Sequence, residues 1–142
     1  MKITRVLIAA AALLWSATGL AQVISVKAKG GFDLVKEDLV LAIQARGLVI
    51  DHTAHIGKML ERTGKDVGSA KRLYDKAEAL QFCSAVVSRG TMEKSVDNIG
   101  YCPYVIALYT LPGDGDTVHI VTRKNLPEVD ALLAEIVKDA LK

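Results

Sequence analysis

Five segments of the chain have the pattern of a β-strand: three alternate apolar and polar residues, which is the period of a strand that buries one face, and the last two are rich in β-branched and aromatic residues. The first segment, residues 23–29, ends at Gly30 and Gly31. The other four are residues 48–56, 78–83, 101–110 and 117–123. A Pro-Gly-Asp-Gly turn at residues 112–115 connects the last two segments. We therefore predict five strands, with a tight turn between the fourth and the fifth.

Two longer segments repeat apolar residues at the helical period instead. One begins at Phe32 and ends before Gly47, and the other begins at Pro127, a residue type favoured at helix starts. The apolar stripe of the first helix consists of Phe32, Val35, Leu39, Ala42 and Ile43. The stripe of the last helix consists of Val129, Leu132, Leu133, Ile136 and Ala140. Both stripes predict helices that pack one face against a sheet.

Shorter helices are expected in two of the connections. Residues 57–76 have sparse apolar positions and are interrupted by Gly64 and Gly68, so we predict one short helix and a loop. Ser84 can cap a helix over residues 85–94. The resulting order, β-α-β-β-β-β-α plus short inserted helices, predicts an α+β fold. We expect a mainly antiparallel five-stranded sheet with helices on one face.

The start of the chain has the organisation of a secretory signal peptide. Lys2 and Arg5 form a positive head, residues 6–15 are continuously apolar, and small residues stand one and three positions before Gln22. The apolar run is shorter than the about 20 residues that a membrane-spanning helix needs. We therefore predict cleavage between residues 21 and 22. The product would be a periplasmic or secreted protein with no membrane span after cleavage.

Residues 22–142 are expected to form a single domain, and their charge argues against one class of partner. The chain has 18 Lys and Arg against 16 Asp and Glu residues, and cleavage removes Lys2 and Arg5, so the formal charge of the remainder is zero. The densest basic stretch, residues 65–76, is interleaved with Asp66 and Asp75. Nucleic-acid-binding domains normally gather a basic excess on one face, so we expect no nucleic-acid partner.

Four short motifs carry a resemblance to a known family. They are Gly-Leu-Val-Ile-Asp at 47–51, Met-Leu-Glu-Arg-Thr-Gly-Lys-Asp at 59–66, Phe-Cys-Ser-Ala at 82–85 and Cys-Pro-Tyr-Val-Ile at 102–106. Over nearly all of its predicted mature length, the chain resembles exported members of the uncharacterised family called domain of unknown function 302. The resemblance implies a TATA-box-binding-protein-like or helix-grip fold, in which a curved antiparallel sheet wraps a long C-terminal helix. It implies no activity, because the family has none assigned.

The cysteines depart from the pattern of many of these relatives. In the relatives, one cysteine ends strand three in a Cys-Asn-Pro motif and another opens strand four in a Pro-Cys-Asn-Val motif. Here Ser84 and Ala85 follow Cys83, and Cys102 precedes Pro103 instead of following it. The second cysteine is thereby shifted by one position, which on a strand could turn its side chain to the other face.

Cys83 and Cys102 are the only cysteines of the chain. They fall at the end of strand three and the start of strand four, so they meet at one edge of the sheet if these strands are antiparallel neighbours. Three interpretations are open: a structural disulfide, which an oxidising compartment favours; free buried thiols; and a redox-active or copper-binding pair. No Cys-x-x-Cys helix start accompanies them.

The chain has three histidines that are candidate metal ligands. His52 and His55 are three residues apart, and on a strand an odd separation sends two side chains to opposite faces. His52 falls on the apolar face and is expected to line the core or a cavity, whereas His55 is expected to be exposed. His119 lies between Val118 and Ile120 and is expected to be buried. We therefore predict no metal site.

Motifs of familiar enzymes are missing from the sequence. It has no Gly-x-Ser-x-Gly nucleophile elbow and no covalent haem motif, and the glycines before Lys65 have the wrong spacing for a phosphate loop. Met59 and Met92 could offer thioethers to copper or haem, but methionines in amphipathic segments are generally core residues, so no cofactor is expected. The sequence thus favours a protein that is not an enzyme.

The preferred hypothesis is a small exported binding or accessory domain. The fold implied by the resemblance encloses a cleft between the sheet and the last helix, where a small apolar or soft ligand could bind. The residues expected to line this cleft are His52, Tyr104, Leu132 and Ile136. The alternative is a thiol-based redox or sulfur-handling protein that uses the two cysteines. A third hypothesis is a homodimer that buries the open edge of the sheet.

Overall fold

The computed structural model describes residues 22–69 and 71–142, so the predicted signal peptide and its cleavage site lie outside the described residues. The element order matches the predicted layout. Along the chain the elements are β1 (Val23–Lys29), α1 (Phe32–Gln44), β2 (Ile50–Ala54), α2 (Ile56–Thr63), β3 (Lys76–Phe82), α3 (Ala85–Lys94), the 3-10 helix η1 (Val96–Tyr101), β4 (Tyr104–Leu111), β5 (Asp114–Arg123) and α4 (Pro127–Ala140).

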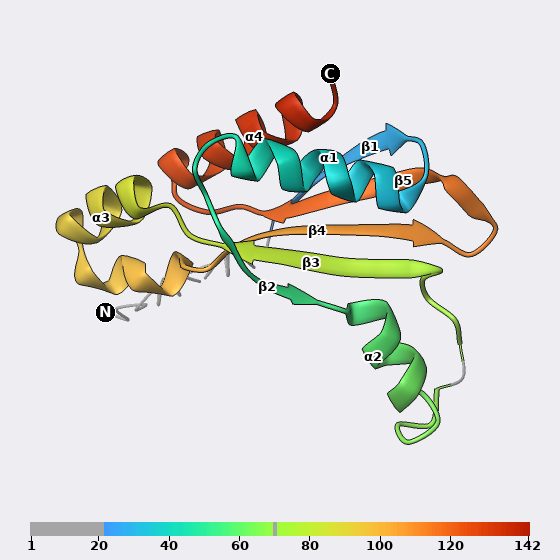
Figure 1. Ribbon diagram of the computed structural model, residues 1–142. Coiled ribbons are helices and arrows are strands. Elements are labelled where there is room, and N and C mark those ends of the chain that lie inside the picture. The colour runs from blue at the N-terminus through green and yellow to red at the C-terminus, as the bar shows by residue number, and fades with distance from the viewer. Residues whose placement is uncertain (1–21, 70) are drawn as a thin grey trace, which may run out of the picture.

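All neighbouring strands of the sheet are antiparallel, in the order β1-β5-β4-β3-β2. Figure 1 shows α1 and α4 together over one face of the sheet, with α3 and η1 at one end and α2 beside the β2 edge. The predicted α+β class and five-stranded antiparallel sheet are therefore confirmed. Within the described residues, no helix combines the length and the apolar composition needed to cross a membrane.

The core lies between the sheet and the two helices α1 and α4. The whole predicted stripe of α1 is buried, as the helical period requires for a helix lying on a sheet. In α4 the buried set differs from the predicted stripe, because Val137 is buried whereas Leu132 and Ala140 are only half-buried. Arg46 also ties the end of α1 to α4 through an ion pair with Asp139, with 2.6 Å between Nη2 and Oδ2.

The second strand is shorter than predicted. The alternation over residues 48–56 predicted one continuous strand, but β2 covers only Ile50–Ala54, and α2 starts at Ile56. The pairing of β2 with β3 also shifts register between Ile50 and His52. A bulge of this kind inserts a residue and moves the following side chains to the other face.

Two boundaries of the hairpin strands also differ from the prediction. The fourth strand begins at Tyr104 instead of residue 101, because η1 extends to Tyr101 and Pro103 has no N–H to donate to the ladder. β5 begins earlier, at Asp114, since the turn is tighter than predicted. Gly113 adopts a φ of 83° in this turn, a conformation that glycine tolerates far better than other residues.

Candidate functional site

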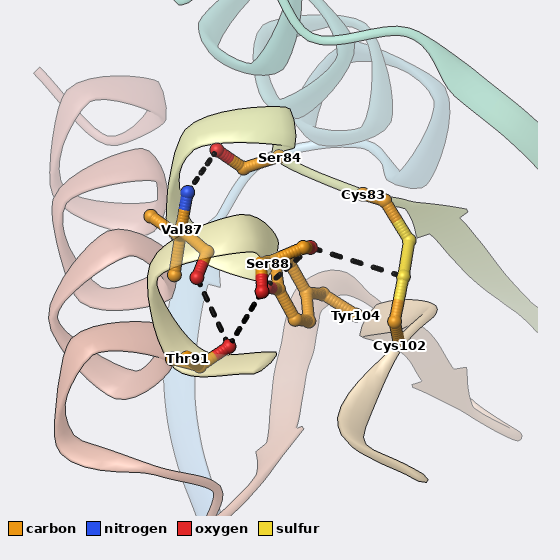
Figure 2. Close-up of a disulfide and its surroundings, with 7 residues drawn as sticks. All are labelled: Cys83, Ser84, Val87, Ser88, Thr91, Cys102 and Tyr104. Atoms are coloured by element: carbon orange, nitrogen blue, oxygen red, sulfur yellow. Dashed lines mark hydrogen bonds between the residues drawn. A yellow bond between two sulfur atoms is a disulfide. The ribbon is translucent and has the colours of Figure 1, made fainter. Parts of the chain in front are cut away.

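Cys83 and Cys102 lie at disulfide distance, with their Cα atoms 6.2 Å apart and their sulfur atoms bonded (Figure 2). Phe82 and Tyr104 are paired across β3 and β4, so Cys83 directly follows one strand and Cys102 lies just before the other. The predicted proximity of the cysteines at one edge of the sheet is therefore confirmed. Their oxidation in the exported protein stays a prediction.

The disulfide closes a loop that carries α3 and η1, and its two cysteines have a sequence separation of 19. Few residues of these two helices are buried: α3 has one buried residue, Thr91, and η1 has none. A covalent link at the base of such a loop restricts the unfolded chain and is worth about 3 kcal/mol for a loop of roughly this length. This geometry favours the structural interpretation of the pair.

Hydrogen bonds beside the disulfide cap α3 and hold it against the start of β4 (Figure 2). Ser84 Oγ accepts a bond from the Val87 N–H at 3.3 Å, which confirms the predicted helix cap. Ser88 Oγ lies 2.8 Å from the hydroxyl of buried Tyr104 and 4.0 Å from Sγ of Cys102. The first half of α3 and the start of β4 therefore pack around the disulfide.

The residues expected to line a sheet–helix cleft occupy different environments. Tyr104 and Ile136 belong to the closed core and Leu132 lies at its margin. His52 is exposed, so the expectation that it lines the core or a cavity is wrong. The register shift in β2 explains the error, because it places His52 opposite Gln81 and Thr53 opposite core residue Leu80.

The other two histidines are placed as expected. His119 is buried and stacks on the ring of Tyr109, with centroids 4.6 Å apart and planes only 3° from parallel. His55 is exposed, and it stands at the start of α2. Within residues 22–69 and 71–142, no group of three or more His, Cys, Asp and Glu side chains is arranged to hold a metal ion.

A pocket of about 450 Å³ lies between α2, the loop that follows it and the start of β3, and we call it the α2 pocket. Its volume falls within the range of small-molecule binding sites. Apolar walls come from Phe32, Leu60, Tyr74 and Ala77. Its rim consists of charged residues and a histidine: Asp33, His55, Lys58, Glu61, Lys65, Lys71, Arg72, Asp75, Lys76 and Glu78.

Gly57 allows α2 to lie close against β3 and so sets the depth of the α2 pocket. A Cβ atom added at Gly57 would stand 3.0 Å from the backbone nitrogen of Ala77, which is closer than ordinary packing allows. A larger residue would therefore push α2 away from the strand. In addition, Tyr74 packs against Tyr109, with ring centroids 5.0 Å apart, and this contact anchors the loop to the sheet.

Glu78 is the most enclosed carboxylate of the α2 pocket, with 16% of its side chain exposed. Lys36 Nζ lies 2.5 Å from Oε2, and Oε1 accepts a hydrogen bond from His55 Nδ1 at 3.0 Å. Burial acts to raise the pKa of Glu78, but the bonds and charges of Lys36 and His55 outweigh it and hold this pKa below its ordinary value. The carboxylate is therefore ionised at neutral pH and links α1, α2 and β3.

Sequence reasoning missed the α2 pocket, although one signal was present. Glu78 alternates with Leu80 and Phe82 along β3, so a charged residue stands on the strand face that builds the core. A charge in such a position needs partners of opposite charge nearby. The partners come from α1 and from the start of α2, and the spacing of residues along the chain does not indicate which helices meet there.

A second opening lies at the opposite edge of the sheet from β2, and we call it the β1–α4 groove. It is bordered by the edge strand β1, by β5 and by α4. Its volume is about 260 Å³. Ile24, Val26, Ile120, Leu133 and Val137 give it apolar walls, and Asp130 and Lys138 are its charged residues. The last helix therefore does border an opening beside the sheet, but with residues other than those predicted.

The fold is similar to that of a solved structure, described as the crystal structure of uncharacterized conserved protein DUF302 from Bacillus stearothermophilus. The alignment has a TM-score of 0.60 and 15% sequence identity, and it covers 83% of this chain and 91% of the other. At this identity the likeness shows the fold alone, and it supports the fold of the family that the sequence motifs resemble. No family model and no curated protein matches the chain.

Proposed function

We propose that the protein is an exported, non-catalytic binding domain of the domain of unknown function 302 family, with a helix-grip type of fold, and that the α2 pocket is its ligand site. The observation that carries the proposal is the combination of apolar walls and a charged rim in a pocket of about 450 Å³. Such a site fits a small organic acid with an apolar body.

The charges on the rim favour an acidic ligand. Asp33 is paired with Lys76, at 2.5 Å, and Glu78 is paired with Lys36 and His55. Arg72 is paired with Asp75. Among the described residues, three rim lysines have no ion-pair partner, namely Lys58, Lys65 and Lys71, and Glu61 is the one rim carboxylate without a partner. The rim therefore has more ammonium groups than carboxylates available to a ligand, and an acid gains from their field.

Size favours the α2 pocket over the β1–α4 groove as the small-molecule site. The groove measures about 260 Å³, below the roughly 300 Å³ at which typical ligand sites begin. It also borders a strand edge, whose backbone groups a small apolar molecule could not satisfy. These two features fit a protein partner better than a ligand.

Nuclear magnetic resonance titration tests the proposal. Phenylacetate, which carries an aromatic ring and one carboxylate, should shift the backbone amide signals of Leu60, Tyr74 and Ala77 in the exported protein. Phenylacetamide, which lacks the charge, should bind more weakly. Lys58→Glu should weaken phenylacetate binding, whereas the control Lys124→Glu, an exposed site outside the pocket, should not.

Two results would refute the proposal. One is the absence of shifts at α2 and β3 up to about 10 mM phenylacetate, which corresponds to negligible affinity. The other is a set of shifts confined to β1 and α4, which would move the ligand site to the β1–α4 groove.

The rival function is thiol-based redox or sulfur handling by Cys83 and Cys102. The half-buried state of both cysteines leaves them partly accessible to a partner. The rival predicts that Cys83→Ser/Cys102→Ser abolishes activity in the exporting cell, while phenylacetate binding and the fold persist. The binding proposal predicts that the same variant is only less stable.

A further inference from the structure

β1 is an edge strand whose outer side has no neighbour in the sheet. It pairs with β5 over its full length without a bulge, and three of its apolar side chains are exposed: Val23 by 59%, Ile24 by 46% and Val26 by 37%. A regular, apolar, unpaired edge is a template for another strand.

The opposite edge of the sheet is protected. β2 has only 5 residues, its register shifts between Ile50 and His52, and α2 follows it directly and packs against β3. Short strands, bulges and covering helices are the usual devices that prevent edge pairing. The two edges therefore differ, and β1 is the one available for association.

We propose that β1 and α4 form the interface of a two-fold symmetric homodimer. In this dimer β1 pairs antiparallel with β1 of a second copy, which joins the two sheets, and the α4 helices face each other across the two β1–α4 grooves. The apolar groove residues Ile24, Val26 and Leu141 of each copy are thereby covered. A two-fold interface uses the same surface on both copies, as this one does.

The charges of α4 suit this arrangement. Asp130 and Lys138 stand at equal distances in sequence on either side of Ala134, and all three line the β1–α4 groove. A two-fold axis near Ala134 places Asp130 of one copy opposite Lys138 of the other, twice. Ala134 itself is small and lets the two helices approach closely.

The charges of β1 also permit self-pairing. An antiparallel register centred on Val26 places Lys27 opposite Ser25 and Lys29 opposite Val23 of the second copy. A register centred on Ser25 places Lys27 opposite Val23. In neither case does a lysine face a lysine, which would be destabilising.

Sedimentation equilibrium of the exported protein tests the dimer. At concentrations up to about 100 μM the wild type should have twice the mass of one chain. Lys138→Glu sets like charges against Asp130 and should weaken the dimer by about tenfold or more. The swap Asp130→Lys/Lys138→Glu should restore most of the affinity.

A second pair of variants tests the dimer independently of the α4 charges and controls for variants that fail to fold. Ile24→Lys, at the edge strand, should abolish the dimer, and the control Leu34→Lys, which replaces an exposed apolar residue of α1, should keep it. Circular dichroism should show all four variants folded. A wild type that stays a single chain at about 100 μM overturns the proposal, and so does a dimer that Ile24→Lys and Lys138→Glu leave unchanged. Neither result affects phenylacetate binding at the α2 pocket, so the two proposals fail separately.

Discussion

Phe82 and Tyr104 face each other across β3 and β4, with ring centroids 6.3 Å apart and planes at 88°. Both rings are fully buried, and edge-to-face contacts of this kind are favourable. The core therefore continues to the end of the two strands, and the disulfide between Cys83 and Cys102 lies immediately beyond it. The disulfide joins two chain segments that the sheet already brings together.

Removal of the disulfide should lower stability without abolishing the fold. In Cys83→Ser/Cys102→Ser we expect the free energy of unfolding to fall by about 3 kcal/mol, because the loop that carries α3 and η1 gains freedom in the unfolded state. Urea denaturation measures the change, with reduced wild-type protein as a second comparison. Alkylation of both thiols in the native exported protein would show that the bond does not form.

Two substitutions in α4 should differ in cost because their burial differs. Ile136 is completely buried, so Ile136→Ala should lower the free energy of unfolding by roughly 2–5 kcal/mol. Leu132 is only half-buried at the edge of the core, so Leu132→Ala should cost clearly less. Thermal unfolding of the two variants measures the two losses of stability, and equal or reversed effects would contradict the observed burial of these two side chains.

The helix and strand periods predicted most of the fold because they record which face of each element is buried. The α1 stripe from Phe32 to Ile43 is buried as predicted. The errors arose where a local event interrupts the period. The bulge in β2 moved His52 to the exposed face, and η1 replaced the expected start of β4.

The candidate site was harder to predict than the fold. The proximity of Cys83 and Cys102 could be predicted from the strand assignment, because the two cysteines flank strands that were expected to be neighbours. The α2 pocket depends on tertiary contacts: the approach of Gly57 to Ala77 and the ion pairs around Glu78. Periodicity contains no information about which distant elements supply such partners.

Export should remove the first 21 residues. The small residues before Gln22 and the apolar run at residues 6–15 predict cleavage between positions 21 and 22. Intact-mass measurement of protein recovered from the periplasm or medium should give a chain that starts at Gln22. An exported protein that retains Met1 would contradict the signal-peptide assignment, and a cytoplasmic control sample should show the uncleaved mass.

The ion pairs of Glu78 should make the free energy of unfolding depend on pH in the acidic range. Lys36 and His55 hold the pKa of Glu78 below its ordinary value in the folded protein, so the unfolded chain binds more protons as the solution becomes acidic. The contribution of Glu78 is therefore fully present at neutral pH and is lost as the pH falls through the range below about 4.3, the usual glutamate value. The pKa of Glu78 is lowered even though burial alone would raise it.

Substitution of Glu78 by glutamine separates this effect from general acid sensitivity. Glu78→Gln should be less stable than the wild type at pH 7, because it loses the charge that pairs with Lys36. The difference should be smaller at about pH 3 than at pH 7, because protonation of the wild-type carboxylate makes it resemble the amide. Glu37→Gln, on the exposed side of α1, should match the wild type at both values. A stability difference between Glu78→Gln and wild type that is independent of pH in urea titrations would show that packing, and not charge, gives Glu78 its role in joining α1, α2 and β3.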